Sequence, residues 1–424
     1  MKQQVREVGV VRGKIYKSRM STMNLFQPLL PQTRSLLEGI PAIIDKTFPL
    51  PGRFRSALPK DIAELSRLLT SGRGERGLSY MGRPALLSAY IRFFLPWNLY
   101  RLCRLLPGLD IHLTANDRVT DLGCGPLTFT AALWISRPDL RSLPLEFQCI
   151  DRSGPALDAG KKLFTALAGE QCLWKIHTIK GDFTTVKTQP AALVCAVNVF
   201  NEMYGDISRC TSDIIKRNAQ KAVRMLAGYG SAESAILVVE PGFPRCGEFI
   251  ALLRNEYLER GYQPLAPCPH NNDCPFPGGI SKAGKNRWCH FAFDTDDAPS
   301  ALHRLSAAAR LPKERAVVSF LFAGKKTAEQ ISPDLRPSIS ALRILSDPFL
   351  LPSLTAASGQ ALTTCGGQAR YGRYCCSQYG LVLLTGEKKS IEKKHSGIVV
   401  EAVLSREKDA KSGALLAWES REQD

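Results

Sequence analysis

The chain has 424 residues, enough for two or three domains of ordinary size with a sizeable core. Apolar residues make up 44% and charged residues 22%, which excludes a largely disordered chain or a fibre. The formal net charge is +17, an excess that favours a polyanionic partner such as nucleic acid or an anionic membrane surface. A merely basic soluble enzyme is the alternative. Because no apolar run approaches the roughly 20 residues that span a bilayer, we expect no integral membrane protein.

The first 60 residues contain eleven lysines and arginines against three acids, so they carry +8 of the net charge. They are rich in proline and only weakly periodic. We therefore expect a basic N-terminal arm over residues 1–58, extended or partly helical, with a solvated disordered leader as the alternative. Between Pro59 and Leu106 apolar residues recur at helical spacing, which predicts two or three helices ahead of the main sheet.

From Arg118 short apolar runs alternate with helical stretches, a pattern typical of βαβ units and a parallel sheet. The expected strands are Val119–Leu122, Leu145–Ile150, Trp174–Ile179, Ala192–Val199 and Ala235–Val239. The expected helices are Thr128–Ile135, Ala156–Ala168, Asp213–Leu226 and Gly247–Arg260. The fold class is therefore α/β and Rossmann-like.

After Gly261 this alternation fails, and prolines, glycines and cysteines dominate as far as Cys289. The sequence then predicts β-like runs and a Gly-rich hairpin, at Phe291–Phe293, Val317–Ala323 and Tyr371–Thr385. Residues 386–424 have the composition of a charged, frayed tail without net charge.

A glycine-containing turn follows the first expected strand. The run Asp121-Leu-Gly123-Cys-Gly125 leads from that strand into a helix. Glycines there let the backbone approach a ligand, and the helix start presents free N–H groups. The second strand ends in Asp151, whose carboxylate can accept hydrogen bonds from a ribose diol.

The third strand is followed by Gly181-Asp182-Phe183, which places a polar group and an aromatic ring where an adenine could lie. This succession of motifs resembles the class I S-adenosylmethionine-dependent methyltransferases. The resemblance implies that Asp121, Gly123, Gly125, Asp151, Asp182 and Phe183 bind the cofactor. A Rossmann-like domain that uses its glycines only for a tight turn is the alternative.

One residue departs from the methyltransferase pattern. Leu127 stands where that pattern has a third glycine, and we expect its side chain to crowd the methionine end of the cofactor. Catalytic residues are unassigned. Asn198, Asn201 and Glu202 follow the fourth strand and can line an acceptor pocket, but helix capping or packing is the favoured interpretation.

Six of the thirteen cysteines lie between Cys268 and Cys376. Cys268, Cys274 and Cys289 are spaced C-x5-C-x14-C in a stretch too rich in proline and glycine for ordinary core. Such thiolates suit zinc or an iron–sulfur cluster, and both usually need a fourth ligand. The candidates are Cys375 and Cys376, with Cys365 behind them, while His270 and His290 keep a Cys3His zinc site open.

The motifs together resemble one family, the mitochondrial small-ribosomal-subunit methyltransferase-like assembly factors and their bacterial relatives. The resemblance covers approximately residues 60–395. In chain order the motifs are Ser79-Tyr80-Met-Gly-Arg83-Pro84, Asp121-Leu-Gly-Cys-Gly-Pro126, Phe200-Asn201-Glu202-Met203, Val239-Glu240-Pro241-Gly242, Pro267-Cys268-Pro-His270, Cys274-Pro275 and Trp288-Cys289-His290-Phe291.

This resemblance implies a four-iron–four-sulfur (4Fe-4S) cluster held by Cys268, Cys274, Cys289 and Cys376, the last because the family places it four positions before a glycine. It also implies a small-subunit assembly or translation factor that binds ribosomal RNA, cytoplasmic in a bacterium and mitochondrial in a eukaryote. An active rRNA methyltransferase and a small-molecule methyltransferase with structural zinc are the alternatives.

We therefore expect four parts. They are the basic arm over 1–58, a helical lead-in with a class I methyltransferase-like domain over 59–265, a cysteine-rich, β-containing metal-cluster module over 266–385, and the charged tail over 386–424.

Overall fold

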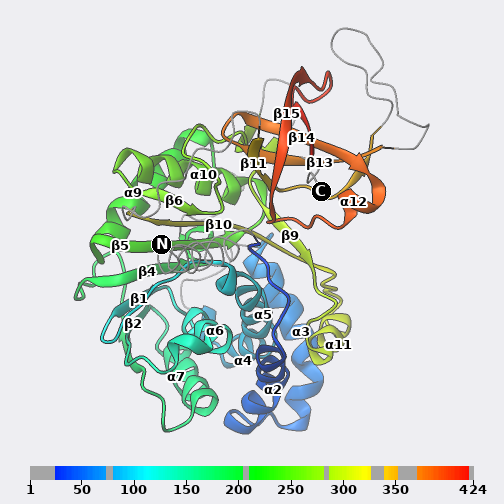
Figure 1. Cartoon of the computed structure of the whole chain (residues 1–424). Coiled ribbons are helices and arrows are strands. Elements are labelled where there is room, and N and C mark those ends of the chain that lie inside the picture. Colours follow the sequence, from blue (N-terminus) through cyan, green and yellow to red (C-terminus); the bar gives the residue numbers. More distant parts are fainter. Residues whose placement is uncertain are drawn as a thin grey trace, which may run out of the picture.

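The computed structural model describes residues 24–72, 80–203, 210–280, 286–325, 339–351 and 370–419. A large sheet covered by helices forms one part of the molecule, and a smaller set of strands from the C-terminal third stands beside it (Figure 1). Within the described ranges, no helix combines the length and the apolar character needed to cross a bilayer.

The large sheet has the strand order β3-β2-β1-β4-β5-β10-β6, with β9 pairing to β10. The strands β1 to β5 are all parallel, whereas β10 runs antiparallel to both β5 and β6. Its strands are β1 (Arg118–Leu122), β2 (Glu146–Asp151), β3 (Lys175–Lys180), β4 (Ala191–Val197), β5 (Gly230–Pro241), β6 (Gln263–Ala266), β9 (Phe291–Asp294) and β10 (Arg315–Gly324). The parallel order of β1 to β5, with helices between the strands, is a Rossmann-like α/β arrangement, so the predicted fold class is confirmed for this part.

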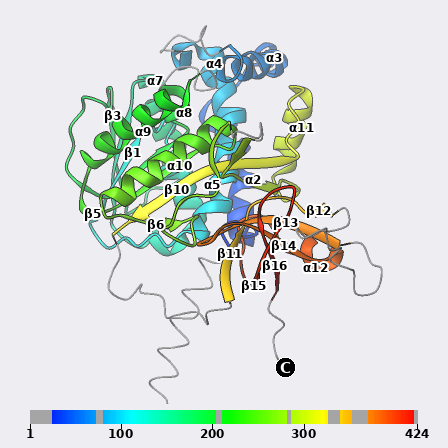
Figure 2. The same cartoon turned by 90° about the horizontal axis from the view of Figure 1, so that it is seen from above.

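Helices cover both faces of this sheet (Figure 1, Figure 2). On one side lie α2 (Pro31–Thr47), α5 (Leu95–Leu105), α6 (Thr128–Ser136) and α7 (Gly154–Ala168). On the other lie α9 (Ser212–Ala227) and α10 (Pro244–Glu259). The shorter or peripheral helices are α3 (Gly52–Leu69), α4 (Pro84–Ala89), the π-helical turn Tyr90–Phe94, α8 (Phe200–Met203) and α11 (Ser300–Ala308). The predicted strands and helices of the βαβ region are confirmed, with boundaries shifted by a few residues.

Residues 24–58 belong to the folded core, which corrects the boundary expected for the arm. Leu25 is fully buried, and Phe26 packs on Phe291 and Phe293 with ring centroids 5.7 and 4.8 Å apart. The expected boundary at residue 58 falls inside α3. The sequence predicted an arm here because the segment is rich in charge. These charged residues lie on the exposed faces of two amphipathic helices, whose apolar faces are buried. Residues 1–23 lie outside the described residues.

The second sheet closes into a small barrel. Its strands run in the order β11-β15-β16-β14-β13-β12, and β11 also pairs with β13. They are β11 (Ile339–Ile344), β12 (Phe349–Leu350), β13 (Arg370–Ser377), β14 (Gly380–Glu387), β15 (Val399–Lys408) and β16 (Leu415–Glu419), with α12 (Lys388–Glu392) between β14 and β15. The β13–β14 pair confirms the predicted hairpin.

The expected charged tail is wrong for residues 386–419, because α12, β15 and β16 complete this barrel. The charged residues alternate with apolar ones such as Ala402 and Ala417, which are fully buried. A strand with one solvated face carries this much charge without fraying.

The expected cysteine-rich module over 266–385 is also not one continuous unit. Both β9 and β10 belong to the large sheet, whereas β11 to β14 belong to the barrel. Ahead of β9 in the chain, the short hairpin of β7 (Pro277–Ile280) and β8 (Asn286–Trp288) packs on α10.

Candidate functional site

The glycine turn after β1 has the backbone that its sequence predicts. Gly123 and Gly125 have φ values of +61° and +52°, the left-handed region that glycine adopts without a steric cost. Asp151, at the end of β2, accepts a hydrogen bond from the Gly125 backbone N–H at 2.8 Å through Oδ2. Its Oδ1 accepts another from the Ser153 N–H at 2.8 Å. The structure therefore brings the predicted glycines and Asp151 together.

Leu127 does not crowd this turn, contrary to the expectation. Its backbone is left-handed, with φ of +59°, as a glycine there would be. Its side chain is fully buried, and a Cβ added to Gly160 of α7 would lie 2.8 Å from Leu127 Cγ. The leucine thus fills the gap between the turn and α7 instead of pointing toward a ligand.

A small cavity lies at the carboxyl ends of β1 and β4. Its lining residues are Tyr90, Asp121, Gly123, Cys124, Thr128, Phe129, Val197 and Asn198. Asp121 is 1% exposed and accepts a hydrogen bond from Thr130 Oγ1 at 3.3 Å. Burial raises the pKa of the Asp121 carboxyl to about 7.

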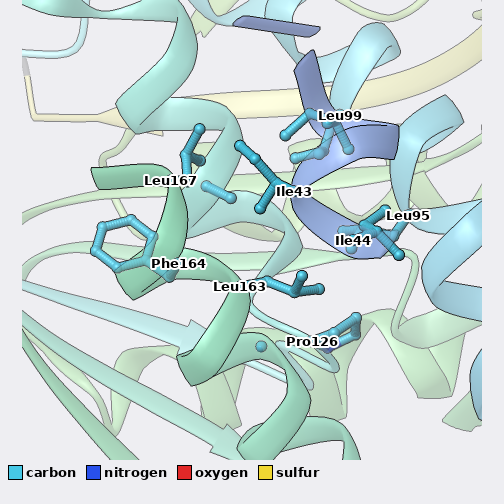
Figure 3. Close-up of a pocket in the computed structure, with 11 residues that line it drawn as sticks. Ile43, Ile44, Leu95, Leu99, Pro126, Leu163, Phe164 and Leu167 are labelled. Carbon is cyan, nitrogen blue, oxygen red and sulfur yellow. The ribbon is translucent and has the colours of Figure 1, made fainter. Parts of the chain in front are cut away.

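A second small cavity, lined by apolar side chains, lies between α2, α5, α6 and α7 (Figure 3). Its walls include Ile43, Ile44, Leu163 and Phe164. Because it offers no polar group to orient a ligand, we assign it no role.

Asp182 and Phe183 are not among the residues that line the cavity at β1. Asp182 forms an ion pair with Arg152 and accepts hydrogen bonds from the Thr184 N–H and hydroxyl, both at 2.8 Å. Phe183 is 8% exposed and belongs to the core on the α9 side of the sheet. Their predicted contact with an adenine therefore stays a prediction.

Glu240, at the end of β5, is a site residue to which the sequence analysis assigned no role. It is fully buried, and its two carboxylate oxygens accept hydrogen bonds from the backbone N–H groups of Val199, Phe200 and Asn201 at 3.1, 2.8 and 3.1 Å. Burial raises the pKa of Glu240 to about 8, while the three N–H donors oppose that rise. The signal available in the sequence was a carboxylate ending a buried apolar strand.

Arg101 of α5 is the second residue that sequence reasoning missed. Its Nη2 donates to Asn98 Oδ1 at 2.7 Å and to Asn198 Oδ1 at 3.1 Å. Its Nη1 donates to the Val317 carbonyl at 3.4 Å. Asn198 is therefore held by α5, and the loop from Asn198 to Asn201 is fixed from two sides.

The four predicted metal ligands meet where the barrel contacts the large sheet. Cys268 follows β6, Cys274 and Cys289 lie on either side of the β7–β8 hairpin, and Cys376 is in β13. Burial raises the pKa of the Cys376 thiol, and so does the charge of each of the other three thiols. The same holds for Cys289 with respect to Cys274 and Cys268. This mutual influence indicates that the four sulfur atoms lie near one another, with Cys376 buried and the other three half-buried.

Cys375 points the other way, into the barrel core with Val382 and Leu384. Neighbouring residues of a strand face opposite sides of it, so only Cys376 faces the loop that carries the other three cysteines. Cys365 lies outside the described residues.

Two buried arginines accompany the thiols. Arg254 of α10 is 2% exposed, and its Nε donates to Cys268 Sγ at 3.2 Å. Arg343 of β11 is 4% exposed and donates from Nε to the Pro267 carbonyl at 2.8 Å and from Nη1 to the Gly397 carbonyl at 2.6 Å. Burial lowers the pKa of Arg343 to about 10, and the charges of Cys268, Cys376 and Cys289 oppose that change.

The histidines near this cluster have different surroundings. His270 Nε2 lies 3.1 Å from Cys376 Sγ, and burial lowers the pKa of this imidazole to about 4. His290 stacks on Trp288 with ring centroids 4.7 Å apart, and its Nδ1 lies 3.2 Å from the Trp288 carbonyl oxygen. Throughout the described part of the chain, no three His, Cys, Asp or Glu side chains form a group ready to hold a single metal ion.

Replacing Asp121 by Asn tests the burial of this carboxyl. Because its pKa is raised to about 7, the folded protein retains a proton that the unfolded chain releases at about pH 4. The stability that this group contributes is therefore complete at low pH and is lost as the pH rises toward 7. We expect denaturant titrations to show that wild-type stability relative to Asp121→Asn falls between pH 4 and pH 7. A constant difference would contradict the raised pKa, and the exposed Asp158 provides the control substitution.

Comparisons with known proteins identify the family of this chain. No curated protein matches the chain. Similar solved structures include a methyltransferase from Thiobacillus denitrificans in complex with S-adenosyl-L-homocysteine, at 14% identity over 55% of this chain and 92% of that one with a TM-score of 0.30. A putative class I methyltransferase from Listeria monocytogenes is 9% identical over 72% of this chain and 90% of that one, with a TM-score of 0.33. The family model described as mitochondrial small ribosomal subunit Rsm22 matches residues 118–352, more than half of the chain. The chain therefore belongs to the Rsm22 family.

Proposed function

We propose that this protein is a small-ribosomal-subunit assembly or translation factor that binds ribosomal RNA. In this proposal a methyltransferase-like domain binds S-adenosylmethionine, and a cysteine-ligated cluster joins that domain to the barrel. Family membership and the net charge of +17 support the RNA partner. The gathering of four thiols from distant chain segments is the observation that carries the proposal.

Charge balance at the junction supports a metal centre. Arg254 and Arg343 are 2% and 4% exposed, and a buried guanidinium charge is stabilised by nearby negative charge. Four thiolates around a four-iron–four-sulfur core carry a net double negative charge, which the two arginines offset. The hydrogen bond from Arg254 to Cys268 Sγ is of the kind that stabilises a ligating thiolate.

The proline after Cys268 and the proline after Cys274 are more typical of iron–sulfur loops than of zinc sites, and they favour an iron–sulfur cluster. Cys268, Cys274, Cys289 and Cys376 would hold it, and it would cross-link the loop after β6 to β13. A Cys3His zinc site with His270 is the alternative, since this ring lies beside Cys376.

The turn after β1 fits a nucleotide-type cofactor. Gly125 leaves the backbone open, since no atom lies within 4 Å of where its Cβ would be, and Asp151 keeps lone pairs for a ribose diol while it accepts the Gly125 N–H. When bound, S-adenosylmethionine would supply a methyl group for transfer. A general base for that transfer is harder to assign, because Asn198 binds Arg101 and the following backbone binds Glu240. This engagement favours a binding scaffold over an active rRNA methyltransferase.

The cluster proposal predicts a specific metal content. Protein purified without oxygen should contain about four irons and four sulfides and absorb broadly at about 400 nm. Cys268→Ser, Cys274→Ser, Cys289→Ser and Cys376→Ser should each lose this absorption and much of their solubility or ribosome association. Cys375→Ser is the matched control and should retain the cluster, because this thiol lies in the barrel core. Stoichiometric zinc without sulfide would overturn the iron–sulfur assignment.

The scaffold proposal predicts cofactor binding without methyl transfer. Calorimetry should show S-adenosylmethionine binding that Asp151→Ala weakens at least about tenfold, since the variant loses the group that orders the Gly125 turn. The exposed Asp158→Ala is the control. Methylation of immature small-subunit RNA by the wild type would identify an enzyme instead.

The basic leader generates a prediction about salt. Residues 1–23 contain six lysines and arginines against one acid, and their removal spares the buried Leu25 and Phe26. We expect this truncation to reduce the slope of log affinity for small-subunit RNA against log salt concentration by about one per lost phosphate contact. An unchanged slope would show that the leader does not touch RNA.

A further inference from the structure

The barrel has a connectivity that identifies its fold type. Numbering β11, β13, β14, β15 and β16 as strands one to five, the neighbours around the barrel are 1-2-3-5-4 and back to 1. The pair of strands three and five, β14 and β16, is parallel, while the other pairs are antiparallel. The short helix α12 lies between strands three and four. This combination is the oligonucleotide-binding (OB) fold, a five-stranded Greek-key barrel.

We infer that the outer face of β13, β14 and β16 in this barrel binds single-stranded RNA by base stacking. The inference deepens the proposed RNA-binding function and rests on it. In OB folds, strands two and three and the loops between strands one and two and between strands four and five form the nucleic-acid surface. Here the described elements among these are β13, β14 and the turn from Asp409 to Ala414 between β15 and β16.

Aromatic and aliphatic side chains cover this face. Tyr374 lies opposite Leu383, and Leu383 lies beside Leu416 of the parallel strand β16. These three belong to a cluster separate from the barrel interior, in which Leu383 and Leu416 are 1% and 4% exposed and Tyr374 packs on Phe349. Trp418 lies two residues beyond Leu416 and is therefore on the same face, with 46% of its surface exposed. An exposed indole on this packed apolar floor offers an unpaired base a sequence-tolerant stacking surface.

Positive charge borders the platform. Arg370 donates from Nη2 to Thr385 Oγ1 at 2.9 Å, at the end of the hairpin away from Cys376. Lys408 and Lys411 are exposed at the turn between β15 and β16. Over the described barrel residues, ten lysines and arginines stand against seven acids. The surface therefore combines stacking rings with cations for phosphates, which a nucleic acid satisfies and an apolar peptide does not.

The test measures binding of the full chain to an unstructured oligouridine by fluorescence anisotropy. Trp418→Ala should weaken binding at least about fivefold, the loss expected for one stacked base. Trp418→Phe should stay within about twofold of wild type because a ring remains. Phe54→Ala, which removes a similarly exposed aromatic side chain from α3, should change nothing. Changing both Lys408 and Lys411 to Gln should lower the salt slope by up to about two.

A duplex RNA hairpin separates stacking from general attraction, because paired bases cannot stack on Trp418. Equal weakening of oligouridine and duplex by Trp418→Ala would overturn the inference, and so would unchanged oligouridine binding. If Trp418→Ala lost ribosome association but kept oligouridine binding, the face would be a protein contact, and this result would also overturn the inference. None of these results affects the cluster assay, so the proposed function is judged separately. An unchanged circular dichroism spectrum and thermal midpoint show that each variant is folded.

Discussion

The junction between the sheet and the barrel brings two buried arginines to the loop that carries the predicted cluster ligands. Because a buried charge is stabilised by a nearby opposite charge, thiolates at these cysteines and the two guanidinium groups would stabilise one another. Arg343 reaches from β11 of the barrel to the Pro267 carbonyl, and Arg254 reaches from α10 to Cys268. The arginines therefore link both parts of the molecule through the same loop that carries the first two cysteines.

Two carboxylates perform a similar task at the carboxyl edge of the large sheet. Asp151 ends β2 and accepts the N–H groups of Gly125 and Ser153, while Glu240 ends β5 and accepts three consecutive N–H groups after β4. Each satisfies backbone donors that a sharp turn leaves unpaired. The loops around the cavity are thus ordered before any ligand binds. Because Asn198 binds Arg101 and the next three N–H groups bind Glu240, the polar residues after β4 stabilise the loop.

Sequence periodicity predicted the βαβ region well because its signals are local. Each buried strand and each amphipathic helix there is visible within about 15 residues. The barrel was missed beyond its β13–β14 hairpin because its pairings are long-range, as between Ile339 and Val403, and its strands mix charged with apolar residues. Leu127 was misjudged for another reason. A glycine pattern predicts backbone angles but not the direction of a side chain, and here Gly160 provides the space that the leucine fills.

The geometry of β13 connects the cluster to the surface that we assign to RNA. Cys376 and Tyr374 are two residues apart in this strand and therefore project from the same face. A cluster bound through Cys376 would fix the strand at one end, and Tyr374 packs on Phe349 beside it. Cys375, the preceding residue, is buried in the barrel core. A shift of the strand by one residue would turn Cys376 into the core and Cys375 toward the cluster, so the two cysteines fix the register. Loss of the cluster would therefore release the orientation of the RNA face while leaving the core of the barrel intact.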